Sequence, residues 1–591
     1  MVSSRNFSNS AIAKLLKNIA VVYKLKKTQP FKMIAYEKAA AVIEQTNLDL
    51  HILWKNNKLT SLPGIGQGIA NHLDELFRTN KVKYFERLLK PYPQAMFSLI
   101  EISGIGPKTA FKLCQKFNLN NPKTAVKQLE KLIKQKKISK IKGFSQESEE
   151  NIQENINQFK QKKDRLSIYQ AFALSKQIIN HLKQSPHIIQ IEPLGSLRRQ
   201  ASTIGDIDIA VITKQPKKAL DYLLKYPQIK KIINQGISKA SIITFNNIQI
   251  DIRFQSPDTF GSLLQHFTGS KSHNIQLRQL AQEKNLSLSE YGIKDKQGKL
   301  KKFSSEEKLY QVLGLDWIPP QLREARGEIK AAQSHKLPNL INLKDIKGDF
   351  HVHTNYFLQS SHDSGVDSFE VLIKKAHQLN YQYIGFADHN PSISRHSSQQ
   401  IIDILKSRKQ EIEKIKYSNE KNVKIRVLNL LEVDIRPDGS LAVPDKGLDQ
   451  LDFAIASIHS SFHQDKATIT NRLLNALKHP KIKILGHPSG RIINHRPSIK
   501  PDWDKIFDFC QKNNKFLEIN AYPSRLDLPD SLIQQAVKYK VKFIINTDAH
   551  AVDQMNFMPY GIAVAKRGWL ESKNVINTLP WNKLTGILNL T

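Results

Sequence analysis

The 591-residue chain is poor in the features that mark disulfide-bonded, secreted or membrane-spanning proteins. Its two cysteines, Cys114 and Cys510, are far apart and form no CxxC pair. This argues against a disulfide framework or a zinc knuckle and is typical of a reducing compartment. The start, MVSSRNFSNS, lacks the apolar core of a signal peptide, and no apolar run reaches the roughly 18 residues of a membrane span. We therefore expect a cytoplasmic protein without a membrane partner.

Acidic residues are scarce relative to basic ones. The chain has 89 Lys and Arg against 53 Asp and Glu, a formal net charge of +36 that is spread along its length. Such an excess of positive charge favours a polyanionic partner, because each phosphate that the protein neutralises releases condensed counterions. A bias towards Lys on solvated faces is the alternative, so charge alone leaves nucleic acid binding open. Composition is otherwise globular, and the length indicates several domains.

The pattern of apolar residues changes twice along the chain. Residues 10–160 show periodic apolar runs between glycine turns, which predict helices. Residues 187–255 hold β-rich runs, and 258–330 mix helix and turn signals before a polar connector, KAAQSHKLPNLINL. From residue 346, strand-like runs alternate with helical ones: DFHVHT, YIGFADH, VLNLLEVDI, FAIASIHS, IKILGHP, FLEINAY and FIINTDAH. Seven such runs predict a barrel-type α/β domain.

Glycine turns recur in the helical region. LPGIGQGIANHL at 62–73 and ISGIGPKTAFKL at 102–113 share a Gly-x-Gly turn before a helix start, and IKGFSQESEENI at 141–152 is a weaker copy. Such turns expose backbone N–H groups that can hold a phosphate, although one copy alone would be an ordinary capped connection. Two clear copies in so basic a chain favour DNA, and they resemble helix-hairpin-helix motifs. The predicted DNA-binding glycines are Gly64, Gly66, Gly104 and Gly106.

Three aspartates predict a cation site in the β-rich region. Asp206 and Asp208 lie two apart in a strand-like run, so their carboxylates project from one face. Asp251, in QIDIRF, adds a third carboxylate from another strand. Such a triad would repel itself without cations, and two Mg²⁺ or Mn²⁺ ions would serve phosphoryl transfer.

The residues just before this strand support a nucleotide-binding role. Gly195 and Ser196 form a turn, and Arg198 and Arg199 follow it, so that the segment can hold and neutralise a triphosphate. An isolated Asp-x-Asp would be a solvated strand face. The Gly-Ser turn ahead of it favours a nucleotidyltransferase.

The segments GSLRRQASTIGDIDI, QIDIR and FTGSKSHNIQLR resemble the palm and nucleotide-selection subdomain of family X DNA polymerases, and the likeness covers residues 10–330. It implies DNA synthesis on gapped or primer-template duplex from dNTPs, with Asp206, Asp208 and Asp251 as catalytic metal ligands. The nucleotide-binding residues that it implies are Gly195, Ser196, Arg199, Gly205, Phe267, Thr268, Gly269, Ser270, Asn274 and Arg278.

The chain also departs from that family. His266 replaces the usual Tyr before Phe-Thr-Gly, which bears on ribose discrimination, and Gln249 replaces an Arg that helps to orient the primer end. Gly68 and His72 stand where lyase-active members carry Lys. Because a Schiff base needs an amine, we expect no lyase activity from that position.

In the C-terminal half, histidines and acids recur at the ends of strand-like runs. They are His351, His353, His389, Glu432, His459, His487, Asp548 and His550. The C-terminal ends of strands in an α/β barrel share one mouth, so these groups should converge. Imidazoles with a few carboxylates suit Mn²⁺, Zn²⁺ or Fe²⁺ better than Mg²⁺, although a single histidine would more often be a core or surface residue.

This pattern resembles a PHP (polymerase and histidinol phosphatase) domain, which follows family X polymerases in bacterial chains. The resemblance implies up to three ions held by nine ligands, and a Mn²⁺-dependent 3′–5′ exonuclease, with phosphodiesterase action or abasic-site cleavage as further activities. The ninth ligand is Asp363, in the long segment NYFLQSSHDSG, with His362 as the alternative.

The predicted organisation is multidomain: a helical helix-hairpin-helix region, an α+β palm and a seven-stranded distorted PHP barrel. The predicted division is 1–90 (lyase-like helical domain with the first hairpin), 91–165 (helix-hairpin-helix fingers), 166–265 (palm), 266–330 (nucleotide selection), 331–345 (linker) and 346–591 (PHP). The favoured function is a gap-filling repair polymerase with an attached 3′ nuclease, monomeric by default. The alternatives are a decayed polymerase that acts as a nuclease, a DNA-end scaffold, and a small-molecule phosphatase.

Overall fold

The computed structural model describes residues 7, 9–26, 29–45, 50–55, 57–62, 64–102, 104–141, 144–161, 165–246, 248–360, 362–422 and 425–590. The chain folds into two compact units, Met1–Asp164 and Arg165–Thr591. No helix in the described part of the chain is both long and apolar enough to span a membrane.

The first unit is entirely helical in its described residues. Its helices are α1 (Asn9–Lys26), α2 (Pro30–Gln45), α3 (Leu50–Lys55), η1 (Leu59–Ser61), α4 (Gln67–Thr79), α5 (Lys83–Leu89), α6 (Gln94–Leu99), α7 (Pro107–Phe117), α8 (Ala125–Lys134) and α9 (Gln146–Gln161). Leu16, Ala39, Leu73 and Leu113, from four of these helices, are fully buried in one continuous core. The prediction of helices over residues 10–160 agrees with this arrangement.

The two clear glycine hairpins have the same backbone conformation. Gly64 and Gly104 take φ values of +81° and +78°, a left-handed region that favours glycine. Gly66 and Gly106 are the N-caps of α4 and α7, with φ/ψ of −76°/169° and −75°/167°. A Cβ atom on either N-cap glycine would meet nothing within 4 Å, so the helix N-terminus is open to a ligand. Gly143 of the weaker third copy lies outside the described residues.

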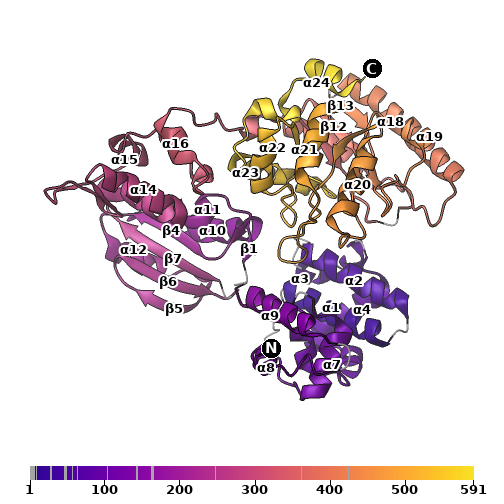
Figure 1. Ribbon diagram of the computed structural model, residues 1–591, viewed down its shortest axis with the longest axis horizontal. Helices are drawn as coiled ribbons and strands as arrows, with labels where there is room; N and C mark the ends of the chain where they lie inside the picture. The colour runs from indigo at the N-terminus through magenta and orange to yellow at the C-terminus, as the bar shows by residue number, and fades with distance from the viewer. Residues whose placement is uncertain are drawn as a thin grey trace. The chain divides into compact units, whose positions relative to one another are not determined.

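The second unit begins with a five-stranded sheet in the order β2-β4-β7-β6-β5, of which Figure 1 shows β4, β7, β6 and β5 side by side. Its elements are β1 (Leu166–Ser167), α10 (Ile168–Leu182), β2 (Gln190–Pro193), α11 (Gly195–Arg198), β3 (Thr203–Ile204), β4 (Ile207–Ile212), α12 (Pro216–Leu223), β5 (Ile229–Gln235), β6 (Lys239–Thr244) and β7 (Gln249–Gln255). Strand β4 alternates strictly: Ile207, Ile209 and Val211 pack with α10 and α12. Asp208 and Ala210 therefore face the other side of the sheet.

A helical and hairpin region follows this sheet. It contains η2 (Pro257–Thr259), α13 (Phe260–Thr268), α14 (Lys271–Glu283), β8 (Ser287–Ser289), β9 (Gly292–Lys294), β10 (Leu300–Lys301), α15 (Glu306–Val312), η3 (Pro320–Leu322), α16 (Glu328–Gln333) and η4 (Leu343–Asp345). Leu263 and Leu264 of α13 pack on Ala210 and Ile212 of β4, and this contact covers the second face of the sheet. The predicted polar connector is partly helical, since α16 includes its first residues.

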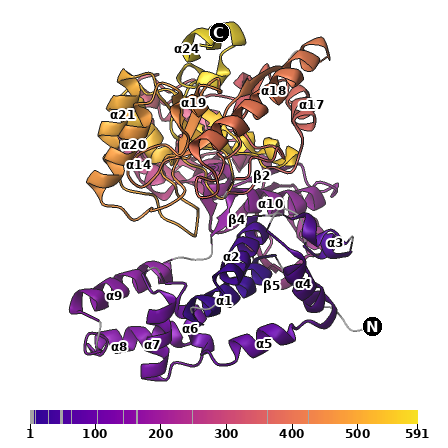
Figure 2. The same cartoon turned by 90° about the vertical axis from the view of Figure 1, so that its right-hand side faces the viewer.

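The C-terminal region alternates strands with helices. Its elements are β11 (Gly348–Val352), α17 (Phe369–Gln378), β12 (Tyr383–Phe386), α18 (Ser398–Asn422), β13 (Arg426–Asn429), β14 (Glu432–Asp434), α19 (Asp445–Leu448), β15 (Ala454–Ser457), α20 (Lys466–Leu477), β16 (Ile482–Leu485), α21 (Trp503–Lys512), β17 (Phe516–Asn520), α22 (Asp530–Lys538), β18 (Phe543–Asn546), η5 (Val552–Phe557), α23 (Met558–Arg567), η6 (Ser572–Asn574), η7 (Ile576–Thr578) and α24 (Trp581–Leu588). Figure 2 shows α20 and α21 on one side of this region and α17 and α18 on the other.

All seven predicted runs contain strands, but the ladders differ from one seven-stranded barrel. The strands form two parallel sheets, β11-β12-β13 and β14-β15-β16-β17-β18. The third run is split, because its first half pairs with β12 and its second half with β15. Two isolated parallel bridges join the two sheets: Val352 of β11 with Ala549 after β18, and His389 after β12 with Glu432 of β14. The described strands thus form an α/β domain with strand ends that point to one side.

Candidate active sites

The predicted aspartate triad lies at one edge of the five-stranded sheet. Asp208 of β4 and Asp251 of β7 are direct neighbours in a parallel ladder, and Asp206 precedes β4 by one residue. Burial, followed by the charges of Asp206 and Asp251, raises the pKa of Asp208 to about 6. Gly195, with φ of +58°, leaves room for this carboxylate, since a Cβ there would lie 3.2 Å from Asp208 Oδ2. Crowded carboxylates of this kind suit divalent cations.

A cavity of about 620 Å³ opens beside the triad. Its walls are formed by Arg165, Gly195, Ser196, Arg199, Asp206, Asp208, His266, Phe267, Thr268, Gly269, Lys271, Asn274, Ile275 and Arg278. Most of the predicted nucleotide-binding residues are therefore brought together. Gly205 and Ser270 are not in the wall: the Ser270 side chain caps α14 by accepting from the His273 N–H at 3.2 Å. Arg165 and Lys271 are basic wall residues that sequence reasoning did not identify.

The two arginines of the Gly-Ser segment have different surroundings. Arg198 does not line the cavity, because it forms a two-pronged ion pair with buried Glu306, Nη1–Oε1 2.9 Å and Nη2–Oε2 2.8 Å. The expectation that Arg198 helps to hold a triphosphate is therefore wrong, since a buried carboxylate requires its charge. Arg199 does line the cavity, and its Nε donates to Glu324 Oε1 at 2.9 Å.

The positions at which the chain departs from the family pattern lie next to this site. His266 lines the cavity, and its ring meets that of Phe267 edge-on, with centroids 4.7 Å apart. Gln249 donates to Asp251 Oδ1 at 3.0 Å, and Lys239 Nζ lies 2.9 Å from Asp251 Oδ2. Burial would raise the pKa of Asp251, but the hydrogen bonds from Gln249 and Lys239 hold it below its usual value. A basic group is thus present beside Asp251, on strand β6 rather than at position 249.

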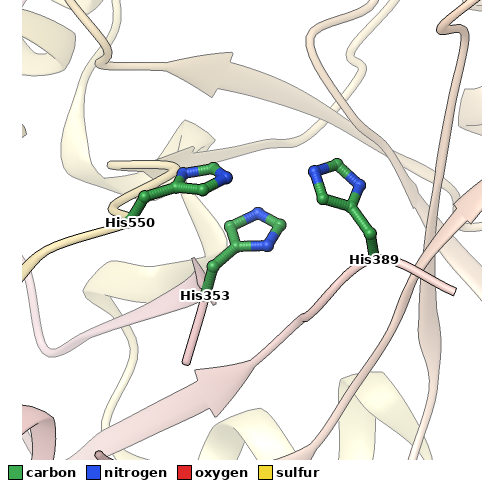
Figure 3. A group of neighbouring side chains, drawn as sticks. All are labelled: His353, His389 and His550. Carbon is green, nitrogen blue, oxygen red and sulfur yellow. The ribbon is translucent and has the colours of Figure 1, made fainter. Parts of the chain in front are cut away.

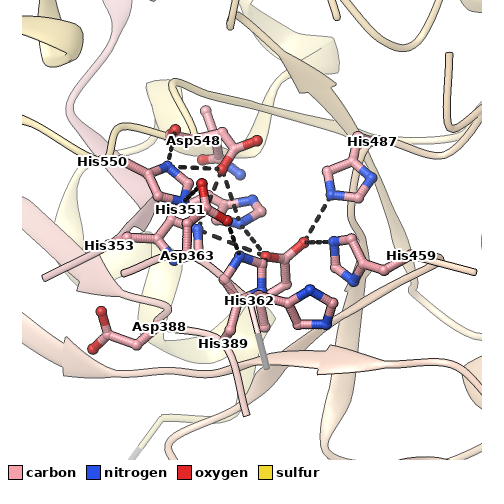
Figure 4. A network of polar contacts seen from close by, with 12 residues as sticks. His351, His353, His362, Asp363, Asp388, His389, His459, His487, Asp548 and His550 are labelled. Carbon is pink, nitrogen blue, oxygen red and sulfur yellow. Dashed lines mark hydrogen bonds and ion pairs between the residues drawn. The ribbon is translucent and has the colours of Figure 1, made fainter. Parts of the chain in front are cut away.

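The second candidate site lies at the C-terminal ends of the parallel strands in the last domain. The eight predicted groups come from β11, β14 and the turns after β11, β12, β15, β16 and β18, and they gather in one place (Figure 4). The imidazoles of His353, His389 and His550 surround a common space (Figure 3), with the rings of His353 and His550 3.9 Å apart.

Glu432 is the centre of the cluster. Its Oε1 lies 2.8 Å from His487 Nε2 and 3.4 Å from His459 Nε2. Its Oε2 lies 3.0 Å from His389 Nδ1 and 3.3 Å from His351 Nε2. These histidine charges, in competition with burial, hold the pKa of Glu432 well below its usual range. A single carboxylate that faces four imidazoles is suited to bridge cations.

The donor groups and unsatisfied buried atoms of this cluster could hold metal ions. Despite these ion-pair distances, several buried atoms form no hydrogen bond of acceptable geometry with the described residues: His351 Nε2, His353 Nδ1 and Nε2, His389 Nδ1, Glu432 Oε2, His459 Nε2, His487 Nδ1 and His550 Nε2. Such groups are costly to bury unless something binds them. The donor set, imidazole nitrogen with carboxylate oxygen, fits Mn²⁺, Zn²⁺ or Fe²⁺.

Neighbouring carboxylates orient these histidines, and sequence reasoning did not assign them. Glu518 of β17 is fully buried, and its Oε1 lies 2.7 Å from His351 Nδ1. Asp434 of β14 lies 2.6 Å from His459 Nδ1. Burial opposes a positive charge on His459, but Glu432 and Asp434 raise its pKa to about 9. Hydrogen bonds of this kind fix which ring nitrogen is available to an ion.

Asp363, the ninth expected ligand, and its alternative, His362, both reach the cluster. Asp363 Oδ1 lies 3.7 Å from His389 Nε2, and its Oδ2 lies 3.7 Å from His550 Nε2. His362 Nε2 lies 2.9 Å from Asp434 Oδ2. The two residues thus approach different sides of the cluster.

Family models match four parts of the chain. Their descriptions are helix-hairpin-helix domain (residues 7–82), SAM-like helix-hairpin-helix tandem (97–157), DNA polymerase beta thumb (263–324) and PHP domain (349–522).

Curated proteins of two kinds are similar to the chain. The DNA polymerase/3'-5' exonuclease PolX of Bacillus subtilis (strain 168) is 34% identical over 569 residues, which cover 96% of each chain. A probable phosphatase of Thermoanaerobacter sp. (strain X514) is 26% identical over 240 residues, 39% of this chain and 89% of that protein. The repair DNA polymerase X of African swine fever virus is 27% identical over 161 residues, 26% of this chain and 89% of the viral protein.

Proposed function

The chain belongs to the family X DNA polymerases that carry a C-terminal PHP domain, and we propose how its two sites divide the activities of a DNA polymerase with 3′–5′ exonuclease. The cavity beside the aspartates fills short gaps during DNA repair, and the histidine cluster removes nucleotides from 3′ ends. The observation that carries this proposal is the presence, in one compact unit, of both a carboxylate-lined cavity and a separate cluster of unsatisfied metal-type donors.

In the polymerase site, Asp206, Asp208 and Asp251 hold two Mg²⁺ or Mn²⁺ ions. Such ions neutralise phosphate charge and hold the attacking and leaving oxygens in line. Asp251 also assists removal of the proton from the primer 3′-OH. Ser196 and Arg199, which line the same cavity, bind the triphosphate of the incoming dNTP, and Arg165 adds further positive charge.

The Phe267–Ser270 turn supports the sugar of the nucleotide, and Asn274 and Arg278 lie beside the base and the template. Asn274 is held in place for this role, since its Nδ2 donates to His266 O at 2.7 Å. Gly205 packs under Arg165, because a Cβ there would lie 2.9 Å from the Arg165 guanidinium.

The helical unit binds DNA through backbone N–H groups at the start of two of its helices. The N-cap positions Gly66 and Gly106 present open helix N-termini that can hold phosphates without reading sequence. Position 72 carries an imidazole stacked on Tyr84, with ring centroids 5.2 Å apart, so it offers no amine for lyase chemistry.

In the PHP site, the eight strand-end residues and Asp363 hold up to three Mn²⁺, Zn²⁺ or Fe²⁺ ions. Ions at such a site polarise a phosphodiester and activate water near neutral pH. Glu518 and Asp434 keep the imidazoles of His351 and His459 in the tautomers that ligation needs. We propose the domain division given above and a monomer in the cytoplasm as the working unit.

Extension and degradation of a labelled primer on gapped duplex, with dNTPs and Mg²⁺ or Mn²⁺, test this division. Asp206→Asn/Asp208→Asn should abolish extension and spare 3′ degradation, and His351→Ala should do the reverse. Asp221→Asn and His463→Ala, at exposed positions, are the matched controls. Wild type that fails to extend would contradict the polymerase role. Phosphate release from histidinol phosphate without nuclease activity would favour a phosphatase instead.

A further inference from the structure

His362 lies within the metal cluster although the strand-end pattern does not include it. It belongs to the segment between β11 and α17, and its ring centroid is 4.6 Å from that of His459 and 4.7 Å from that of His389 (Figure 4). Asp363, its neighbour in the chain, approaches His389 and His550 from the other side. His362 and Asp363 are therefore not alternatives for one position.

Four groups of donors in the described residues could hold an ion. Three consist only of predicted ligands: His353, His389 and His550; His351, His353 and Glu432; and Glu432, His459 and His487. The fourth group is His362, His389 and His459, whose donor atoms all lie within 4.8 Å of one another. This fourth group exists only because His362 is present.

Asp434 presents His362 and His459 to the same space. The carboxylate lies 2.9 Å from His362 Nε2 and 2.6 Å from His459 Nδ1. A neutral ring that donates to Asp434 has its lone pair on the other nitrogen, and for His459 this is Nε2, which is buried without a hydrogen-bond partner among the described residues. A carboxylate behind an imidazole is the usual support of a metal-ligating histidine.

The position of His362 also fits a ligand better than a packing residue. Its neighbours are three polar groups, His389, His459 and Asp434, rather than an apolar core. The side chain is 24% exposed, so it lies at the solvent-facing side of the cluster, whereas His351 and His353 are fully buried.

We propose that His362 is an additional nitrogen ligand of a divalent ion bound between His389 and His459. This inference rests on the metal-dependent nuclease proposed above and adds a residue to its site. Three imidazoles around one ion favour Zn²⁺, Fe²⁺ or Mn²⁺ over Mg²⁺, because nitrogen donors suit borderline cations. The affinity for an ion in this position should therefore be higher than that of a site formed by His389, His459 and water alone.

Metal binding by the full-length protein tests the proposal. The protein is stripped with a chelator, reloaded with Zn²⁺ or Mn²⁺, and its bound equivalents and affinities are measured by elemental analysis and competition titration. His362→Ala should lose one equivalent or weaken one site by tenfold or more, in line with the roughly 10–100-fold effects of perturbing metal sites. His463→Ala, an exposed histidine near the same strand end, should bind as wild type does.

A second variant separates ligation from support of Asp434. His362→Gln keeps an N–H donor for Asp434 but lacks the imidazole lone pair, so it should resemble His362→Ala. X-ray absorption of the Zn²⁺-loaded protein should report fewer histidine ligands in both variants. Wild-type metal content in His362→Ala, or full recovery in His362→Gln, would overturn the proposal. Wild type that binds no metal would contradict the proposed nuclease itself, which is a distinct outcome.

Discussion

Arg199 and Arg567 donate to the same carboxylate oxygen, Oε1 of Glu324, at 2.9 Å and 2.8 Å. Arg199 lines the polymerase cavity, whereas Arg567 ends helix α23 of the PHP domain. Arg567 Nη2 also lies 2.8 Å from Asp530 of α22. The side chain that we propose for the triphosphate is thus held by an ion-pair network whose other end lies in α22 and α23.

We expect this network to make nucleotide affinity sensitive to Arg567. In Arg567→Lys, one ammonium cannot pair with both Glu324 and Asp530 as the guanidinium does. Glu324 should then bind Arg199 more strongly and compete with the triphosphate. We expect the KM for dNTPs to rise about fivefold, equivalent to about 1 kcal/mol, with kcat within twofold of wild type. Steady-state primer extension at varied dNTP concentration measures the KM and kcat. Lys566→Ala, at the neighbouring position, is the control and should leave the KM unchanged. An unchanged KM in Arg567→Lys would show that Arg199 is not positioned through Arg567.

Lys239 should carry the positive charge that Gln249 does not supply. Lys239→Gln removes the cation 2.9 Å from Asp251 Oδ2, and the pKa of Asp251 should rise. Since Asp251 must be ionised to hold metal, we expect single-turnover extension to slow on the order of tenfold, and more at pH 6 than at pH 8. Adding Gln249→Arg should restore part of the loss. A rate that is equal to that of wild type across this pH range would contradict the assignment.

Hydrophobic pattern and residue chemistry predicted much of both sites. The strands in the seven C-terminal runs could be predicted because parallel strands are buried on both faces and therefore read as apolar runs. The polar residues at the ends of these runs predicted where the histidine cluster lies. Sequence could not tell which of Arg198 and Arg199 faces the cavity, because that depends on buried Glu306, more than a hundred residues away. The third run, VLNLLEVDI, is divided into β13 and β14 because the two halves pair with different strands. Apolar character alone does not predict which strands will pair.

The residues that sequence reasoning missed act through other side chains or across long separations. Glu518 lies inside the buried strand β17 and Asp434 ends β14, and the acid within the buried run of β17 was a signal that could have been used. Arg165 reaches the cavity from before the palm strands, and no local motif marks it.

Glu306 should make the stability of the region around α15 depend on pH. Burial opposes its charge, but Arg323 and Arg198 lower its pKa from 4.5 to about 2. A lowered pKa stabilises the fold above the unfolded value, and this contribution is lost as pH falls from about 4.5 towards 2. Glu306→Gln leaves both arginines unpaired and should cost about 3 kcal/mol at pH 7.

The difference in unfolding free energy between wild type and Glu306→Gln should shrink below pH 4.5. Trp317, one of five tryptophans, donates to Glu306 at 3.2 Å, so tryptophan fluorescence during urea unfolding at pH 7, 5, 4 and 3.5 includes a signal from this region. Glu307→Gln, at an exposed neighbouring position, should match wild type at every pH. A difference that stays constant to pH 3.5 would show that Glu306 is not ionised in the fold.

Removal of metal should destabilise the PHP domain, and Glu518 should set how strongly metal restores it. Without ions, buried nitrogens such as His353 Nδ1 have no hydrogen-bond partner among the described residues, so chelation should lower the Tm of this domain and Mn²⁺ should raise it again. Glu518→Gln exchanges the carboxylate 2.7 Å from His351 Nδ1 for a neutral amide. We expect Mn²⁺ affinity to fall about 10–100-fold, so a higher Mn²⁺ concentration is needed for the same rise in Tm. Glu413→Gln, on the surface of α18, should leave the titration unchanged. Equal titrations for wild type and Glu518→Gln would mean that His351 needs no carboxylate to bind metal.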